Sequence, residues 1–191
     1  MLVWTYQLLF FGSPLLLAAF VHGVCLKYDL LPFLKRPLDF RLSFRGKRLL
    51  GENKTWRGLV IQITCCTLGG IIQGWLQKLG FIPPWIRFLD YAELGPLIGL
   101  VLGLGMTLGE LPNSFLKRQF DIPPGQRKRG IQGALFLVLD QVDLALGVWF
   151  FFFLLVKPPV LLVVWSLALT LVLHLSVSGI GYILKMRKTP S

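Results

Sequence analysis

The chain carries five apolar stretches, each long enough for an α-helix to cross a lipid bilayer: residues 2–26, 59–79, 92–111, 132–156 and 159–184. A membrane-spanning helix needs roughly 20 apolar residues. Only helices and closed β-barrels satisfy every backbone N–H and C=O within lipid. The apolar runs are continuous and lack the alternation of barrel strands. We therefore predict an all-α, polytopic integral membrane protein with about five transmembrane helices in one membrane domain, residues 1–191.

Composition supports the same fold class. Hydrophobic residues make up 54% of the 191 residues and charged residues only 15%, which is unlike a soluble domain. The first apolar stretch has no basic segment before it and no small-residue cleavage site after it. We therefore expect it to stay in the protein as the first helix, and not to be removed as a signal peptide.

The basic residues are distributed unevenly between the two sides of this predicted bundle. The connecting segments 27–58 and 112–131 and the C-terminal tail contain most of the lysines and arginines. The positive-inside rule places both loops and the C-terminus in the cytoplasm and the N-terminus outside, in a multi-pass protein of the cell membrane. The net charge of +11 then suits anionic lipid headgroups or phosphates. Nucleic acid is not an expected partner, because so little of the chain lies outside the bilayer.

The first basic loop, "RPLDFRLSFRGKRLLGENKTWRG" at 36–58, is a candidate phosphate-binding segment. It is not a P-loop, because Lys54 and Thr55 do not directly follow Gly51 and no strand precedes the loop. The Lys-Thr pair does stand just before a predicted helix, whose N-terminus favours phosphate. A simple basic patch that holds the orientation of the protein is the alternative, although such a patch would not require Asp39.

The second loop, "GELPNSFLKRQFDIPPGQRKRG" at 109–130, begins where the third predicted helix ends. Amide and hydroxyl groups that form hydrogen bonds alternate here with two adjacent cations. The candidate residues are Glu110, Asn113, Ser114, Lys117 and Arg118. A solvated amphipathic turn is the alternative interpretation.

Two carboxylates, Asp140 and Asp143, lie within the fourth apolar stretch in the sequence "LDQVD". An aspartate at the centre of a membrane helix costs about 2.5 to 3.5 kcal/mol on insertion scales. Residues three apart share one face of a helix, so both carboxylates can point into the bundle. A divalent cation between them would remove their repulsion and bind phosphate. Pairing with a lysine or arginine, and a proton relay, are the alternatives.

Small residues follow one another at intervals of four along the third apolar stretch: Gly95, Gly99 and Gly103, then Gly105 and Gly109. This spacing is typical of a ridge at which helices pack closely in a membrane. The three cysteines, Cys25, Cys65 and Cys66, have no metal-ligand spacing with a histidine, and we interpret them as small core residues.

Three blocks of the sequence resemble the CDP-archaeol synthases: "PLDFRLSFRGKRLLGENKTWRG", "GELPNSFLKRQF" with "PPG", and "LDQVD" followed by "HLSVSGIGYILKMRKTPS". These are membrane enzymes of the CTP:lipid-phosphate cytidylyltransferase group, related to bacterial CDP-diacylglycerol synthase. The resemblance covers nearly the whole chain. It implies a five-helix membrane fold and transfer of CMP from CTP to a membrane lipid phosphate, which yields a CDP-lipid and pyrophosphate.

The resemblance also implies roles for the candidate residues. Catalysis would involve Asp140, Asp143, Lys117 and Arg118, with Mg²⁺ bound by the two aspartates and Glu110. Substrate-binding residues would be Asp39, Gly51, Lys54, Thr55, Asn113 and Ser114. The expected partners are CTP, a lipid phosphate and the bilayer, and a homo-oligomer is left open.

The chain departs from the archaeal pattern at Glu110, where we expect Asp, at Ser178, where we expect Asn, and in the segment before the aspartate pair, which lacks a typical proline. These departures favour a bacterial-type member with an undetermined lipid tail. A different class of function stays open. A non-catalytic or transport protein of the same fold would bind anionic lipid or carry protons through the aspartate pair. Such a protein has no evident use for Lys54–Thr55 and Lys117–Arg118 on the same side of the membrane.

Overall fold

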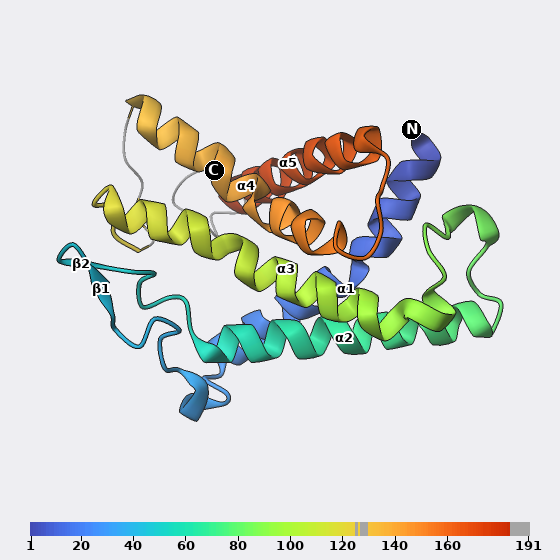
Figure 1. Cartoon of the computed structure of the whole chain (residues 1–191), viewed down its shortest axis with the longest axis horizontal. Coiled ribbons are helices and arrows are strands. Elements are labelled where there is room, and N and C mark those ends of the chain that lie inside the picture. Colours follow the sequence, from blue (N-terminus) through green and yellow to red (C-terminus); the bar gives the residue numbers. More distant parts are fainter. Residues whose placement is uncertain (125, 127–129, 184–191) are drawn as a thin grey trace.

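The computed structural model describes residues 1–124, 126 and 130–183, and within them the chain folds into five long helices (Figure 1). The fold class is confirmed as all-α, since the β-structure in these residues is one hairpin of two-residue strands and an isolated bridge between Pro37 and Thr55. The long helices are α1 (Leu2–Lys27), α2 (Trp56–Lys78), α3 (Tyr91–Gln119), α4 (Gly130–Phe152) and α5 (Val160–Ile183). The short elements are η1 (Pro32–Leu34), β1 (Ser43–Phe44), β2 (Lys47–Arg48) and η2 (Pro84–Ile86).

Length and apolar composition support a multi-pass membrane protein. The helices α1 and α2 and the segment Pro84–Gln119, which includes α3, are long and apolar enough to cross a membrane. The two halves of α4, Gly130–Asp140 and Val142–Phe152, meet at 47° and raise the number of candidate spans to four if they form one span. In α5, the segment Val160–Leu173 is apolar but shorter. Five helices therefore occupy the expected places, while the count of five spans stays a prediction.

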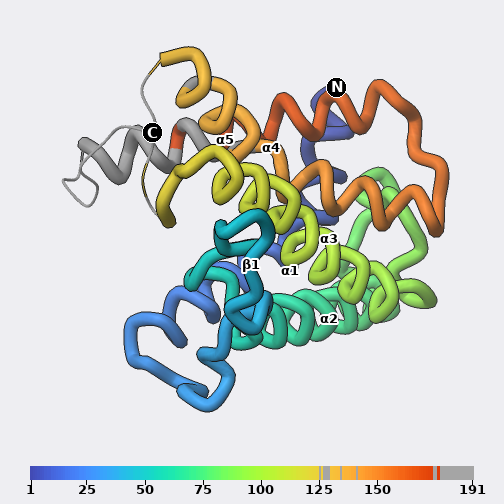
Figure 2. The backbone as a smooth tube through the Cα atoms, turned by 60° about the vertical axis from the view of Figure 1, so that its left-hand side comes forward, coloured from blue at the N-terminus to red at the C-terminus, as the bar shows by residue number. Residues whose placement is uncertain are grey.

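The central helix is α3, which lies between α2 and α4 (Figure 2). Its two glycine series face these two neighbours. A Cβ atom added to Gly103 would come within 2.6 Å of the Ile63 Cα in α2, and one added to Gly109 within 2.6 Å of the Gly147 Cα in α4. The predicted packing ridge is thus confirmed, because the backbones approach too closely for any side chain.

Aromatic side chains fill the space between α1, α4 and the segment before α3. Phe11 of α1 lies against Phe88, Trp149 and Phe152, with ring centroids 5.1 to 6.0 Å apart. Phe152 is fully buried. This cluster holds α4 against the rest of the bundle and so fixes the end of α4 that lies away from the aspartates.

α3 continues eight residues beyond the expected boundary at residue 111 and ends at Gln119. The sequence predicted a loop here because the apolar stretch ends near Glu110 and polar residues follow. Here Pro112 is accommodated within α3, and the helix continues through the polar residues behind it. Glu110, Asn113 and Lys117 therefore lie along one face of a single helix, since residues three and four apart are neighbours on its surface.

Candidate active site

A polar cavity of about 390 Å³ lies at the end of α3, between the loop that precedes α2 and the first half of α4. It brings together most of the residues predicted from the sequence, although they come from three separate parts of the chain. Among the described residues, the predicted ones that line it are Lys54, Glu110, Asn113, Ser114, Lys117, Arg118, Asp140 and Asp143.

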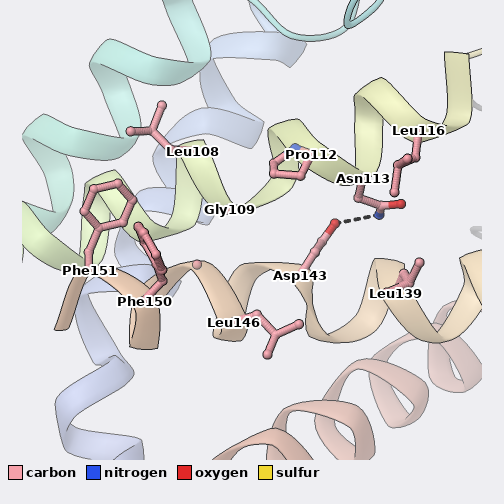
Figure 3. A pocket seen from close by; sticks show the side chains of 11 residues that line it. Leu108, Gly109, Pro112, Asn113, Leu116, Leu139, Asp143, Leu146, Phe150 and Phe151 are labelled. Carbon is pink, nitrogen blue, oxygen red and sulfur yellow. Dashed lines mark hydrogen bonds between the residues drawn. The ribbon is translucent and has the colours of Figure 1, made fainter. Parts of the chain in front are cut away.

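The side chain of Asn113 joins the two aspartates of α4. Its amide nitrogen Nδ2 donates to Asp140 Oδ1 at 2.6 Å and to Asp143 Oδ2 at 2.8 Å, the second of which is drawn in Figure 3. The two carboxylates therefore converge on one point, as the three-residue spacing predicted. Asn113 itself is buried, with 7% of its surface exposed.

Two ion pairs cross the cavity. Lys117 of α3 binds Asp140 of α4, and Lys54 of the first loop binds Glu110 of α3. Both pairs are partly shielded from solvent, with side-chain exposures between 19% and 28%. Arg118 also lines the cavity, and its buried Nε has no hydrogen-bond partner among the described residues. Its cationic side chain is thus suited to an anion that enters the cavity.

The predicted metal ligands are only partly brought together. Among the described residues, no group of three His, Cys, Asp or Glu side chains is close enough to hold a metal ion. Glu110 is paired with Lys54 in place of the expected contact with the aspartates. A magnesium site that includes Glu110 therefore stays a prediction.

Asn113 offers an alternative third oxygen. Its Oδ1 atom is buried and has no hydrogen-bond partner in the described part of the chain. A half-turn of the planar amide exchanges Nδ2 with Oδ1 and would point this oxygen at the position where Asp140 and Asp143 converge. Three oxygen donors suit a hard cation such as Mg²⁺, which commonly completes its shell with water and substrate phosphates. These residues therefore fit the cofactor that the sequence predicted.

Asp39 lies outside the polar cavity and organises the first loop. Its carboxylate is fully buried and accepts hydrogen bonds from the Arg48 side chain and from the backbone N–H groups of Arg41, Leu50 and Gly51. Burial favours a raised pKa, but these hydrogen bonds outweigh it and lower the pKa of Asp39. The charged carboxylate thus folds the loop around itself, and its oxygens are occupied by donors of the same loop, so the predicted contact of Asp39 with the substrate stays a prediction.

Gly51 and Thr55 support the cavity from the side of this loop. Gly51 has a φ of +101°, and a Cβ at this position would approach Arg118 Nη1 to 3.0 Å. The positive φ therefore requires glycine, and the guanidinium of Arg118 packs directly on it. Thr55 is the N-cap of α2, where its hydroxyl accepts from the Gly58 N–H at 3.3 Å. Neither residue is among those that line the cavity.

A second cavity, of about 590 Å³, adjoins the first and is lined mainly by apolar side chains of α3 and α4 (Figure 3). Asn113 and Asp143 line both cavities. The apolar lining includes Pro112, Leu116, Leu139, Leu146, Phe150 and Phe151. The sequence did not identify these residues as part of the site. In an apolar helix, a residue that lines a groove and a residue that faces lipid have the same sequence pattern.

The polar cavity also contains residues that were not predicted as part of the site: Leu50, Asn53, Pro123, Pro124 and Gln126. The adjacent prolines belong to the "PPG" segment that contributed to the family resemblance, so this signal was available. Pro124 lies close to Gly51, which brings the second loop against the first.

Comparisons with known proteins agree with the motifs. The model of the CarS-like, CDP-archaeol synthase family matches residues 6–191. The CDP-archaeol synthase of Methanosarcina mazei is 30% identical over 170 residues, with 81% of this chain and 90% of that protein covered. The CDP-archaeol synthase of Methanoregula boonei is 34% identical over 163 residues, with 81% and 88% covered.

The fold has a counterpart among solved structures. It is an intramembrane enzyme for archaeal membrane lipid biosynthesis, and the superposition has a TM-score of 0.62. The sequences are 22% identical, and 88% of this chain and 90% of that one are covered. Fold, motif order and family match converge: this chain belongs to the CarS-like, CDP-archaeol synthase family of membrane enzymes, the CTP-dependent nucleotidyltransferases that its motifs indicated.

Proposed function

We propose that the protein transfers CMP from CTP to a membrane lipid phosphate. A phosphate oxygen of the lipid attacks the α-phosphorus of CTP, and a new P–O bond forms. The bond between the α-phosphorus and the oxygen that bridges to the β-phosphate breaks, so pyrophosphate leaves with the bonding electron pair. The products are a CDP-lipid and pyrophosphate.

One observation carries this proposal: a charged cavity and an apolar cavity meet at Asn113 and Asp143. A triphosphate needs cations and a metal-binding group, which the first cavity offers. A lipid needs a surface for its hydrocarbon chains, which the second cavity offers. The lipid phosphate would then lie at the shared wall, next to the bound nucleotide. A site with a charged cavity beside an apolar one fits a reaction between a water-soluble substrate and a membrane-bound substrate.

The chain's own groups would bind and orient the substrates. Lys54, Lys117 and Arg118 would hold the phosphates, while Ser114 would donate a hydrogen bond to them. The lipid phosphate is already ionised at neutral pH, so no strong general base is needed. Catalysis would depend mainly on in-line placement and on cations that stabilise the charge on the leaving pyrophosphate.

Magnesium would be held by Asp140 and Asp143, with the Asn113 amide oxygen as the third protein ligand. When bound, it supplies positive charge that orients the triphosphate and stabilises the charge that develops on the phosphoryl oxygens. In the structure Lys117 pairs with Asp140. Binding of the metal and the nucleotide would release this lysine from the carboxylate and make it available to a phosphate.

The proposal is tested with purified protein, CTP, magnesium and one of two lipid phosphates: an ether-linked isoprenoid lipid phosphate or ester-linked phosphatidic acid. Pyrophosphate release and the mass of the CDP-lipid are measured together. We expect a CDP-lipid from at least one of the two lipid phosphates. Comparison of the two shows whether the enzyme uses ether-linked or ester-linked hydrocarbon chains. Asp143→Asn should lower the rate by about 100-fold or more, because it removes a charged group from the reacting centre.

Glu52→Gln is the matched control, since Glu52 is an exposed carboxylate of the first loop and does not line the cavity. Its rate should equal that of the unaltered protein. The proposal fails if no lipid phosphate yields pyrophosphate, and the site assignment fails if Asp143→Asn keeps full activity.

A further inference from the structure

We propose that residues 31–45 of the first loop form a membrane-docking surface that inserts into the headgroup region of an anionic bilayer. The surface consists of the apolar residues Phe33, Phe40, Leu42 and Phe44 and the basic residues Arg36, Arg41 and Arg45. None of these seven residues lines the polar cavity. The proposal is therefore independent of the reaction proposed above.

The apolar side chains of this surface are exposed although they belong to a connecting loop. Phe33, Phe40 and Leu42 expose 69%, 66% and 59% of their surface, and Phe44 exposes 47%. The loop does have an interior, because the Asp39 carboxylate and Gly51 are buried in it. Phe44 also contacts the Phe115 ring of α3 at 6.2 Å, but the other three are exposed over more than half of their surface, which indicates that another apolar phase covers this loop.

The charge of the surface indicates which phase covers it. Arg36, Arg41 and Arg45 are exposed, and none of them forms a salt bridge within the described part of the chain. The neighbouring cations are already used inside the protein: Arg48 binds Asp39 and Arg57 binds Asp29. Arg45 lies over the Phe44 ring at 5.2 Å, and aromatic side chains next to arginines without an ion pair are complementary to the anionic headgroup region of a bilayer.

Backbone hydrogen bonds also connect the loop to the ends of α1 and α2. The Leu30 N–H donates to the Cys25 carbonyl at the end of α1, and the Trp56 N–H at the start of α2 donates to the Arg36 carbonyl. The Phe40 ring lies 6.0 Å from the ring of Trp56. Because tryptophan at a helix end is typical of the membrane–water interface, this contact places Phe40 at interfacial depth.

The backbone of the loop holds these side chains in place. Phe40, Arg41 and Arg45 have φ values of 47°, 65° and 53°, in the left-handed region that bulky residues rarely adopt. The Asp39 carboxylate accepts hydrogen bonds from the Arg41 N–H and the Arg48 side chain, and these maintain the backbone conformation at Phe40 and Arg41. The buried carboxylate thus orients both the cavity side and the membrane side of the same loop.

The test measures whether lipid covers this surface. Single variants Phe33→Cys, Phe40→Cys and Glu52→Cys are placed in nanodiscs that hold one protomer, made with zwitterionic lipid alone or with added anionic phosphatidylglycerol. The rate of reaction with an uncharged, water-soluble maleimide is then measured. In anionic discs, positions 33 and 40 should react at least about tenfold more slowly than position 52. The unaltered protein gives the background rate of its native cysteines.

The contribution of the arginines is tested in the Phe40→Cys protein. Adding Arg41→Gln or Arg45→Gln should speed the reaction about fivefold for each cation in anionic discs, and leave it unchanged in zwitterionic discs. Equal rates at positions 40 and 52 in anionic discs would overturn the proposal. Protection that appears only in discs with two protomers would also overturn it, because a second copy of the chain would then be the partner.

Discussion

At the residue scale, the structure assigns different tasks to side chains that the sequence placed in one group. Asp39 and Thr55 stabilise the loop and the helix start, whereas Lys54 and Lys117 line the cavity. The sequence singled out eight of the described residues that line the polar cavity, because charged and amide side chains stand out in an apolar chain. It did not predict their partners, since Glu110 contacts a lysine that is 56 residues away in the chain.

The Lys54–Glu110 pair leads to a prediction about how Lys54 is positioned. Glu110→Gln should lower kcat/KM for CTP by about five- to thirtyfold, which corresponds to about 1 to 2 kcal/mol, because Lys54 loses the carboxylate that holds it. Lys54→Met should have a similar effect. The kcat/KM of the double variant should be no lower than that of the more damaging single variant, because both substitutions remove the same ion pair.

The dependence of the rate on magnesium separates this role from metal binding. If Glu110 only positions Lys54, the magnesium concentration for half-maximal rate is unchanged in Glu110→Gln. A rise in that concentration would instead identify Glu110 as a metal ligand. Asp140→Asn is the comparison, and we expect it to raise the magnesium requirement.

At the scale of the elements, α3 connects the membrane bundle to the site. Its two glycine series allow α2 and α4 to approach it closely, and its final turns present the polar face of the cavity. The sequence predicted the glycine ridge from its regular spacing. It did not predict the extension to Gln119 or the bend of α4 between Asp140 and Val142.

The close contact between α2 and α3 predicts that one added methyl group on α3 lowers the stability of the protein. A Cβ at Gly99 would approach the Thr67 Cα to 2.7 Å, so Gly99→Ala must separate the two backbones. We expect a loss of about 1 to 3 kcal/mol in the free energy of unfolding in detergent.

Gly23→Ala in α1 is the matched control. An added Cβ there meets nothing within 4 Å, and alanine is a better helix former than glycine. Its stability should be unchanged or higher by up to about 1 kcal/mol. Equal stability of the Gly99→Ala and Gly23→Ala proteins would show that the contact between α2 and α3 is looser than described.

At the scale of the whole molecule, the first basic loop lies against the end of α3, which carries Lys117 and Arg118. Lys47 of β2 donates to the Gln119 carbonyl at 2.7 Å and pairs with Asp121, which joins the first loop to the end of α3. The Lys54–Glu110 pair forms a second connection. The cations of the first loop and Lys117 and Arg118 of α3 thus meet at one end of the molecule, whereas the basic residues 127–129 and the C-terminal tail lie outside the described residues.

We predict that this end of the molecule faces the cytoplasm. In inverted membrane vesicles, a membrane-impermeant maleimide should modify Glu52→Cys but not Lys78→Cys, which lies at the other end of α2. In right-side-out cells or spheroplasts the pattern should reverse. Modification of Lys78→Cys in inverted vesicles alone would mean that the protein is oriented the other way.

The sequence by itself determined the features that depend on local pattern. Apolar length set the helices, glycine spacing set the helix contacts, and the order of charged motifs indicated the family. The tertiary structure alone decided the features that depend on distant neighbours: the pairing of Lys54 with Glu110, the convergence of Asn113 on two aspartates, and the apolar cavity beside them. The physical reason is that periodicity along one helix fixes which residues share a face, whereas the partner that covers that face is fixed only when the helices pack.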